Sequence, residues 1–174
     1  MKLLVLAAAA AVLLAPAAAA QTVSVGTTNG QTDTTYVNGE WAWDVGNDVE
    51  AIVEGRLRES NSHLVKVGFQ REFVDLGLVK LSGRLNLTQT VGVGKDFAGI
   101  SIEPTASFNI DKAKVTVGYE IGDSLRTKDT NGTVRTSTML VMYPFTFGNF
   151  GLQYENERGD LKQESVSLVY SLKQ

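Results

Sequence analysis

Strict alternation of apolar and polar residues between Ala98 and Ile121 is the feature that most constrains the fold of this chain. From Ala98 to Ile110 every second position is apolar, and the pattern resumes at Ala113 after the polar pair Asp111-Lys112. A period of two residues predicts two β-strands, each with one apolar and one polar face, joined by a tight turn. The alternation alone leaves open whether the apolar face packs into a protein core or faces lipid.

Similar runs fill the chain from Gln21 to Gln174, and we count ten of them, with eight as the alternative count. Glycine is abundant (17 residues) and proline is scarce (3), which suits many short strands and turns. A chain of 174 residues fits one domain. The expected fold is all-β: a closed, antiparallel, up-and-down transmembrane β-barrel of about ten strands.

Residues 1–20 have the layout of a secretory signal peptide. Lys2 is the positive start, Leu3–Leu14 is the apolar stretch, and Ala18-Ala19-Ala20 is an Ala-x-Ala cleavage site. A transmembrane helix is the alternative, but Pro16 and the abrupt change to polar residues disfavour it. We therefore expect a helical leader over residues 1–20 and an outer-membrane β-barrel domain over residues 21–174.

The predicted connections between strands alternate in length. The short ones are Gly46–Asp48, Val74–Gly77, Asp111-Lys112 and Gly148-Asn149. The longer, more polar ones are Thr27–Thr34, Glu59–His63, Thr88–Asp96, Asp123–Thr133 and Asn156–Lys162. Transmembrane barrels have short turns on one side of the membrane and longer loops on the other, so this alternation favours the lipid-facing interpretation.

Aromatic residues gather towards the strand ends that carry the short turns. Rings that are partly apolar and partly polar favour the boundary between membrane and water, so these residues form a candidate aromatic belt. The belt residues are Trp41, Trp43, Phe73, Phe108, Phe145, Phe147, Phe150 and Tyr170.

If the apolar faces look outward, the polar faces line the lumen. The candidate lumen-lining residues are Glu50, Glu54, Arg56, Arg58, Lys66, Glu72, Lys80, Arg84, Glu103, Lys114, Glu120 and Glu155. With Lys112 added, seven positive charges face six negative ones, a near balance that suits ion pairing across a narrow interior. We therefore expect a barrel plugged by its own ion pairs. The alternative is a secreted soluble β-barrel with its apolar residues inside and its charges outside.

The sequence allows more specific predictions for two of the strands. Pro104 lies within the strand that starts at Ala98, and because proline lacks an amide hydrogen we expect a bulge or kink there. The run over residues 133–147 is apolar on both parities. Its expected outer face is Met139, Val141, Tyr143, Phe145 and Phe147.

On these patterns the chain resembles the small single-chain outer-membrane β-barrels of Gram-negative bacteria, which are loosely porin-like. The resemblance covers Gln21 to Gln174; Val166, Leu168 and Tyr170 fit the alternating last strand of such families, although the final residues lack the terminal aromatic. It implies localisation in the outer membrane and a structural role or a narrow, plugged pore for ions or small solutes. It also implies the lipid bilayer, the insertion machinery and periplasmic chaperones as partners.

The sequence shows no catalytic constellation. His63 is the only histidine and there is no cysteine, so we expect no enzymatic activity, no metal site and no cofactor. A net charge of −3 without a basic patch argues against a nucleic-acid partner. A binding or adhesion barrel acting through its outer loops, above all Asp123–Thr133, remains the second functional hypothesis.

Overall fold

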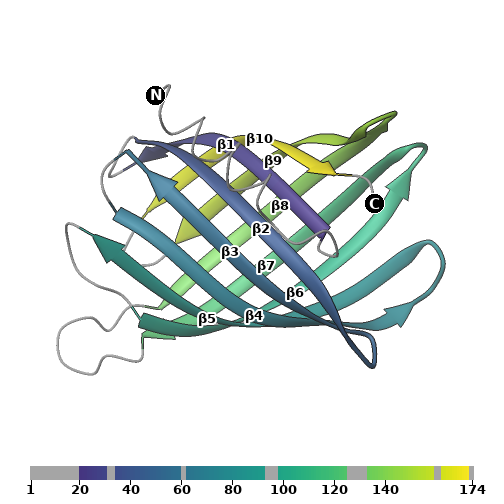
Figure 1. Ribbon diagram of the computed structural model, residues 1–174, viewed down its shortest axis with the longest axis horizontal. Helices are drawn as coiled ribbons and strands as arrows, with labels where there is room; N and C mark the ends of the chain where they lie inside the picture. Colours follow the sequence, from purple (N-terminus) through teal and green to yellow (C-terminus); the bar gives the residue numbers. More distant parts are fainter. Residues whose placement is uncertain are drawn as a thin grey trace.

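The chain folds into a closed barrel of ten antiparallel strands in chain order, with β1 paired to β10 (Figure 1). The computed structural model describes residues 20–30, 34–59, 62–92, 98–124, 133–158 and 162–172. In these ranges no helix is long and apolar enough to cross a membrane. The strands are β1 (Ala20–Gly30), β2 (Thr34–Gly46), β3 (Val49–Arg58), β4 (Ser62–Asp75), β5 (Val79–Gly92), β6 (Ala98–Ile110), β7 (Ala113–Ser124), β8 (Val134–Phe145), β9 (Gly148–Arg158) and β10 (Gln163–Leu172). The predicted up-and-down barrel is confirmed.

The two ends of the barrel differ. The turns β2–β3, β4–β5, β6–β7 and β8–β9 lie at one end, at the right of Figure 1, together with the start of β1 and the end of β10. We call this the short-turn end and the opposite one the long-loop end. Most of the predicted long loops, including most of Asp123–Thr133, and residues 1–19 of the predicted leader lie outside the described residues.

Two short turns are stabilised in the same way. The Asp44 carboxylate accepts a hydrogen bond from the backbone N–H of Gly46, and the Asp75 carboxylate accepts one from Gly77, each at 2.7 Å. Aspartate favours turns because its side chain can satisfy a backbone N–H two residues further along. The strand register shifts beside both turns, which marks a β-bulge at each.

The strand register shows no bulge at Pro104, where a bulge or kink was expected. Pro104 pairs in register with Gly83 of β5, and on the β7 side the register is the same at Ile102–Ile121 and at Thr105–Gly118. The ladder between those two pairs is interrupted, because the missing proline N–H removes a donor towards β7. The strand tolerates the loss as a local gap, without an inserted residue.

The turn between β8 and β9 is also displaced from its expected place. It falls at Thr146-Phe147, whereas Gly148-Asn149, the predicted turn, opens β9. The ladder runs through Phe145 and Gly148, so the two aromatic-rich strand ends remain paired up to the turn.

The outer surface of the barrel is apolar and the interior is polar. Leu87, Ile102 and Leu168 point outward and are 56%, 55% and 69% exposed. The neighbouring positions Asn86 and Ser101 point inward and are 0% and 6% exposed. This distribution is the reverse of a soluble barrel, in which the apolar side chains fill the interior. It decides the question that the alternation leaves open, and it disfavours the secreted soluble barrel.

Candidate functional site: the barrel interior

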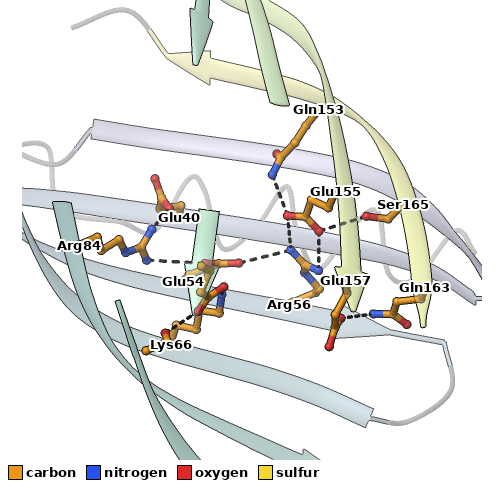
Figure 2. A network of polar contacts seen from close by, with 12 residues as sticks. Glu40, Glu54, Arg56, Lys66, Arg84, Gln153, Glu155, Glu157, Gln163 and Ser165 are labelled. Carbon is orange, nitrogen blue, oxygen red and sulfur yellow. Dashed lines mark hydrogen bonds and ion pairs between the residues drawn. The ribbon is translucent and has the colours of Figure 1, made fainter. Parts of the chain in front are cut away.

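An arginine–glutamate pair crosses the interior from one wall to the other (Figure 2). Arg56 on β3 donates two hydrogen bonds to Glu155 on β9, at 3.1 Å from Nη1 and 3.0 Å from Nη2. Strands β3 and β9 share no backbone ladder, so this pair spans the lumen. The Arg56 guanidinium also lies 4.7 Å from the centre of the Tyr36 ring, a cation–π distance. The arginine is therefore held between a carboxylate and an aromatic face.

Two further ion pairs join strands that are not neighbours. Lys66 on β4 lies 2.8 Å from Glu120 on β7. Arg84 on β5 lies 2.8 Å from Glu40 on β2. Glu54 links the Arg56–Glu155 and Arg84–Glu40 pairs, because its two carboxylate oxygens lie 3.6 Å from Arg56 and 3.6 Å from Arg84 (Figure 2).

These side chains form one layer across the barrel, which we call the waist network. Its members are Glu40, Glu54, Arg56, Lys66, Arg84, Glu120 and Glu155. Most are shielded from solvent, with side-chain exposures of 9% for Glu54 and 8% for Arg84. Removing one partner of a buried ion pair typically costs about 3–5 kcal/mol, because the other charge is left uncompensated. The charged members of the network therefore depend on one another for their stability.

Hydroxyl and amide side chains complete the network on the β6 and β9–β10 walls. Ser101 donates to Glu120 at 2.5 Å, Ser165 donates to Glu155 at 3.1 Å, and Gln153 donates to Glu155 at 2.8 Å. Glu155 thus accepts bonds from Arg56, Ser165 and Gln153, which is close to the capacity of one carboxylate. These polar contacts fix the position of the carboxylate that Arg56 binds.

A glycine makes room for the aromatic part of the interior. Tyr36 is 1% exposed and lies over Gly26 of β1. A Cβ atom at Gly26 would lie 2.8 Å from the Tyr36 ring and 2.6 Å from the carbonyl oxygen of Val166. Because the second contact is with backbone, a side chain at this position would have to displace the ring or the strand.

The candidate lumen residues fall into two groups. Eight lie inside the barrel: Glu54, Arg56, Arg58, Lys66, Arg84, Glu103, Glu120 and Glu155. Four are exposed near the short-turn end: Glu50, Glu72, Lys80 and Lys114. In that second group Lys80 lies 3.2 Å from Glu72 and 2.9 Å from Asp75, so it pairs along the rim of the barrel and not across the lumen.

Three interior residues were not among those predicted from the sequence. Glu40 shares the polar parity of β2, and that parity was the signal that could have found it. Glu157 accepts a hydrogen bond from Gln163 at 2.7 Å, but it lies where a loop was expected to begin at Asn156. Tyr36 shares the parity of Glu40, and its ring gave no local sign that it would pack beneath an arginine.

Aromatic side chains lie on the outer surface near the short-turn end. Tyr143, Phe145, Phe150 and Tyr170 form a continuous chain of ring contacts, with successive centroid distances of 5.5, 5.5 and 4.6 Å. Phe147, in the β8–β9 turn, is 82% exposed. Of the other candidate belt residues, Phe73 is exposed and lies over Gly83, whereas Trp41, Trp43 and Phe108 are half-buried.

No cluster of three metal-binding side chains occurs in the part of the chain that the structure describes. His63 lies at the start of β4, opposite Val91 of β5. Its position on the outward parity of β4 separates it from the carboxylates of the waist network.

The comparisons with known proteins identify the fold. No protein-family model matches the chain, and no curated protein matches it. Among solved structures it is similar to the NanC porin, with 9% identity and a TM-score of 0.53 over 88% of this chain and 100% of the other. It is also similar to the translocator domain of the autotransporter NalP from Neisseria meningitidis, with 9% identity and a TM-score of 0.54 over 99% and 94%. The chain has a porin-like barrel fold.

Proposed function

We propose that this chain is an outer-membrane β-barrel protein that encloses a narrow pore for ions or small solutes, closed at its waist by ion pairs. One observation carries the proposal: the barrel is apolar outside and ion-paired across its interior. A closed barrel leaves no unpaired strand edge, which is a condition for crossing lipid. Its strands of 10 to 14 residues are long enough to span a bilayer when tilted.

The aromatic belt supports the same placement. The ring chain from Tyr143 to Tyr170 lies on the outer face beside the short turns. Tyrosine and other aromatic side chains favour the level of the lipid headgroups. The lipid bilayer is therefore the first partner that we propose, with the insertion machinery and periplasmic chaperones acting during assembly.

A pore agrees with the interior chemistry better than an enzyme does. In the described ranges the interior acids are paired with arginine or lysine or lie close to them, and the single histidine lies on the outward parity. General acid–base or nucleophilic catalysis needs a positioned base beside a reacting group. The waist network instead uses its acids to hold cationic side chains across the lumen.

Replacing both members of the crossing pair tests the proposal. The double variant Arg56→Ser/Glu155→Ser removes the ion pair that joins β3 to β9 across the lumen, and the net charge of the lumen stays the same. We expect wild-type protein in planar lipid bilayers to show a small conductance and the double variant to show one several-fold larger, because the narrowest section is widened. Single-channel recording gives the measurement.

The matched control is Glu72→Ser/Lys80→Ser, which removes an ion pair of the same kind at the exposed rim. Its conductance should equal that of the wild type. A wild-type conductance as large as that of Arg56→Ser/Glu155→Ser would contradict the closed waist. Inserted barrels of the double variant that carry no current would contradict the pore itself.

A further inference from the structure

The charges inside the barrel do not balance. Among the described residues, six carboxylates lie in the interior, on Glu40, Glu54, Glu103, Glu120, Glu155 and Glu157, against four cationic groups, on Arg56, Arg58, Lys66 and Arg84. The eight interior residues among the sequence candidates balance, with four charges of each sign, so the excess comes from Glu40 and Glu157, which were not among those candidates. The part of the interior that the structure describes therefore has two more carboxylates than cationic groups.

Two of the carboxylates are not used for ion pairing among the described residues. Glu103 on β6 faces Arg84 across the β5–β6 ladder, but no ion pair forms, because Arg84 turns towards Glu40. Glu157 on β9 accepts a hydrogen bond from the neutral amide of Gln163. Neither carboxylate is therefore held in a direct ion pair with a cation of the waist network.

A fully buried amide lies on the β5 wall of the barrel. Asn86 on β5 is 0% exposed, points inward against Gly68, and pairs with Ser101 on the neighbouring strand. Neither its amide oxygen nor its amide nitrogen has a hydrogen-bond partner in the described structure. Buried polar groups are normally satisfied, so this amide indicates a place where water or an ion supplies the missing contact.

The mouth at the short-turn end has the same sign of charge. A hollow of about 590 Å³ is lined by Asp44, Asp48, Glu50, Glu72 and Asp75. Lys80 compensates two of these acids, and Lys112 and Lys114 lie on the β6–β7 side of the same end. A concave surface lined with excess negative charge raises the local concentration of cations.

We propose that the pore selects small inorganic cations over anions, with Glu103 and Glu157 as the residues that set the preference. The inference rests on the proposed function, since selectivity requires a conducting lumen. An anion passing the waist would meet carboxylates that are not tied up in ion pairs and would be repelled, whereas a cation would be attracted by them.

The test is to measure the reversal potential in a KCl gradient, for the wild type and for Arg56→Ser/Glu155→Ser. The double variant is included because its larger expected current allows a more precise measurement. We expect a potential of the sign that K⁺ permeation produces, in both proteins. Glu103→Gln should lower the K⁺/Cl⁻ permeability ratio by roughly twofold or more, the size of effect typical of one partly screened charge. The matched control is Glu164→Gln, because Glu164 lies exposed on the outward parity of β10.

The outcomes separate the two proposals. A reversal potential at zero or of the Cl⁻ sign, in barrels that do conduct, would overturn cation selectivity and leave the pore intact. An equal effect of Glu103→Gln and Glu164→Gln would overturn the role of Glu103. Absence of current from inserted barrels of Arg56→Ser/Glu155→Ser would instead overturn the proposed pore. Retained heat-modifiable mobility on electrophoresis shows that Glu103→Gln is folded.

Discussion

At the residue scale, the barrel depends on a close fit between Gly26 and the ring of Tyr36. We expect Gly26→Ala to destabilise the folded barrel by about 1–3 kcal/mol, because the new methyl group meets the ring and the Val166 carbonyl oxygen. The measurement is the thermal unfolding midpoint in detergent.

Gly55→Ala is the control for this substitution, since a Cβ atom there meets nothing within 4 Å. Its midpoint should stay near that of the wild type or rise slightly, because alanine restricts the unfolded chain more than glycine does. Equal stability of the two variants would show that Tyr36 is not held by the glycine.

At the element scale, Pro104 leaves a gap in the ladder between β6 and β7. We expect Pro104→Thr to supply the missing N–H and to stabilise the barrel by about 0.5–1.5 kcal/mol, the usual net value of one hydrogen bond. Amide exchange around Tyr119 on β7 should slow. Pro144→Thr, beside the β8–β9 turn, should have a smaller effect because strand ends fray. An unchanged amide-exchange rate at Tyr119 would mean that strand twist, and not the missing proline N–H, causes the gap in the ladder.

The β6–β7 hairpin and the β8–β9 turn show how far the strands could be predicted from the sequence. The β6–β7 hairpin begins at Ala98 and turns at Asp111-Lys112 as expected, because strict alternation on both sides of a polar pair leaves one register. The β8–β9 turn was misplaced because β8 is apolar on both parities near Leu140, so no change of pattern marks its end. Glu157 was missed because a charged strand end resembles a loop.

The interior was predictable only as a list of side chains. Parity indicates which residues share a face, and it separated Glu54, Arg56 and Arg84 from the apolar positions between them. The partners of each charge depend on which walls the closed sheet brings face to face, as with β3 and β9. That relation between distant strands has no local sequence signal, so the Arg56–Glu155 pair could not be derived beforehand.

At the scale of the whole molecule, the placement of the barrel in a membrane depends on its apolar outer surface. Ile102 is 55% exposed on β6, and outward leucines of the neighbouring strand β5, such as Leu87, are exposed to a similar extent. In water an apolar surface of this extent would favour aggregation, whereas in a bilayer it is solvated by lipid tails. The inward face of the same strands carries Ser101 and Glu103, which suit a wet or ion-paired lumen.

Site-directed spin labelling can show whether the outer face of the barrel lies in lipid, because the chain has no cysteine of its own. Single cysteines would replace Ile102 and Ala106 on the outward face of β6 and Thr105 and Ser107 on its inward face, with each labelled protein reconstituted in liposomes. We expect collisions with oxygen, which concentrates in lipid, to be frequent at Ile102 and Ala106 and rare at Thr105 and Ser107. Outward labels that collide instead with a water-soluble nickel complex would contradict a membrane-spanning barrel.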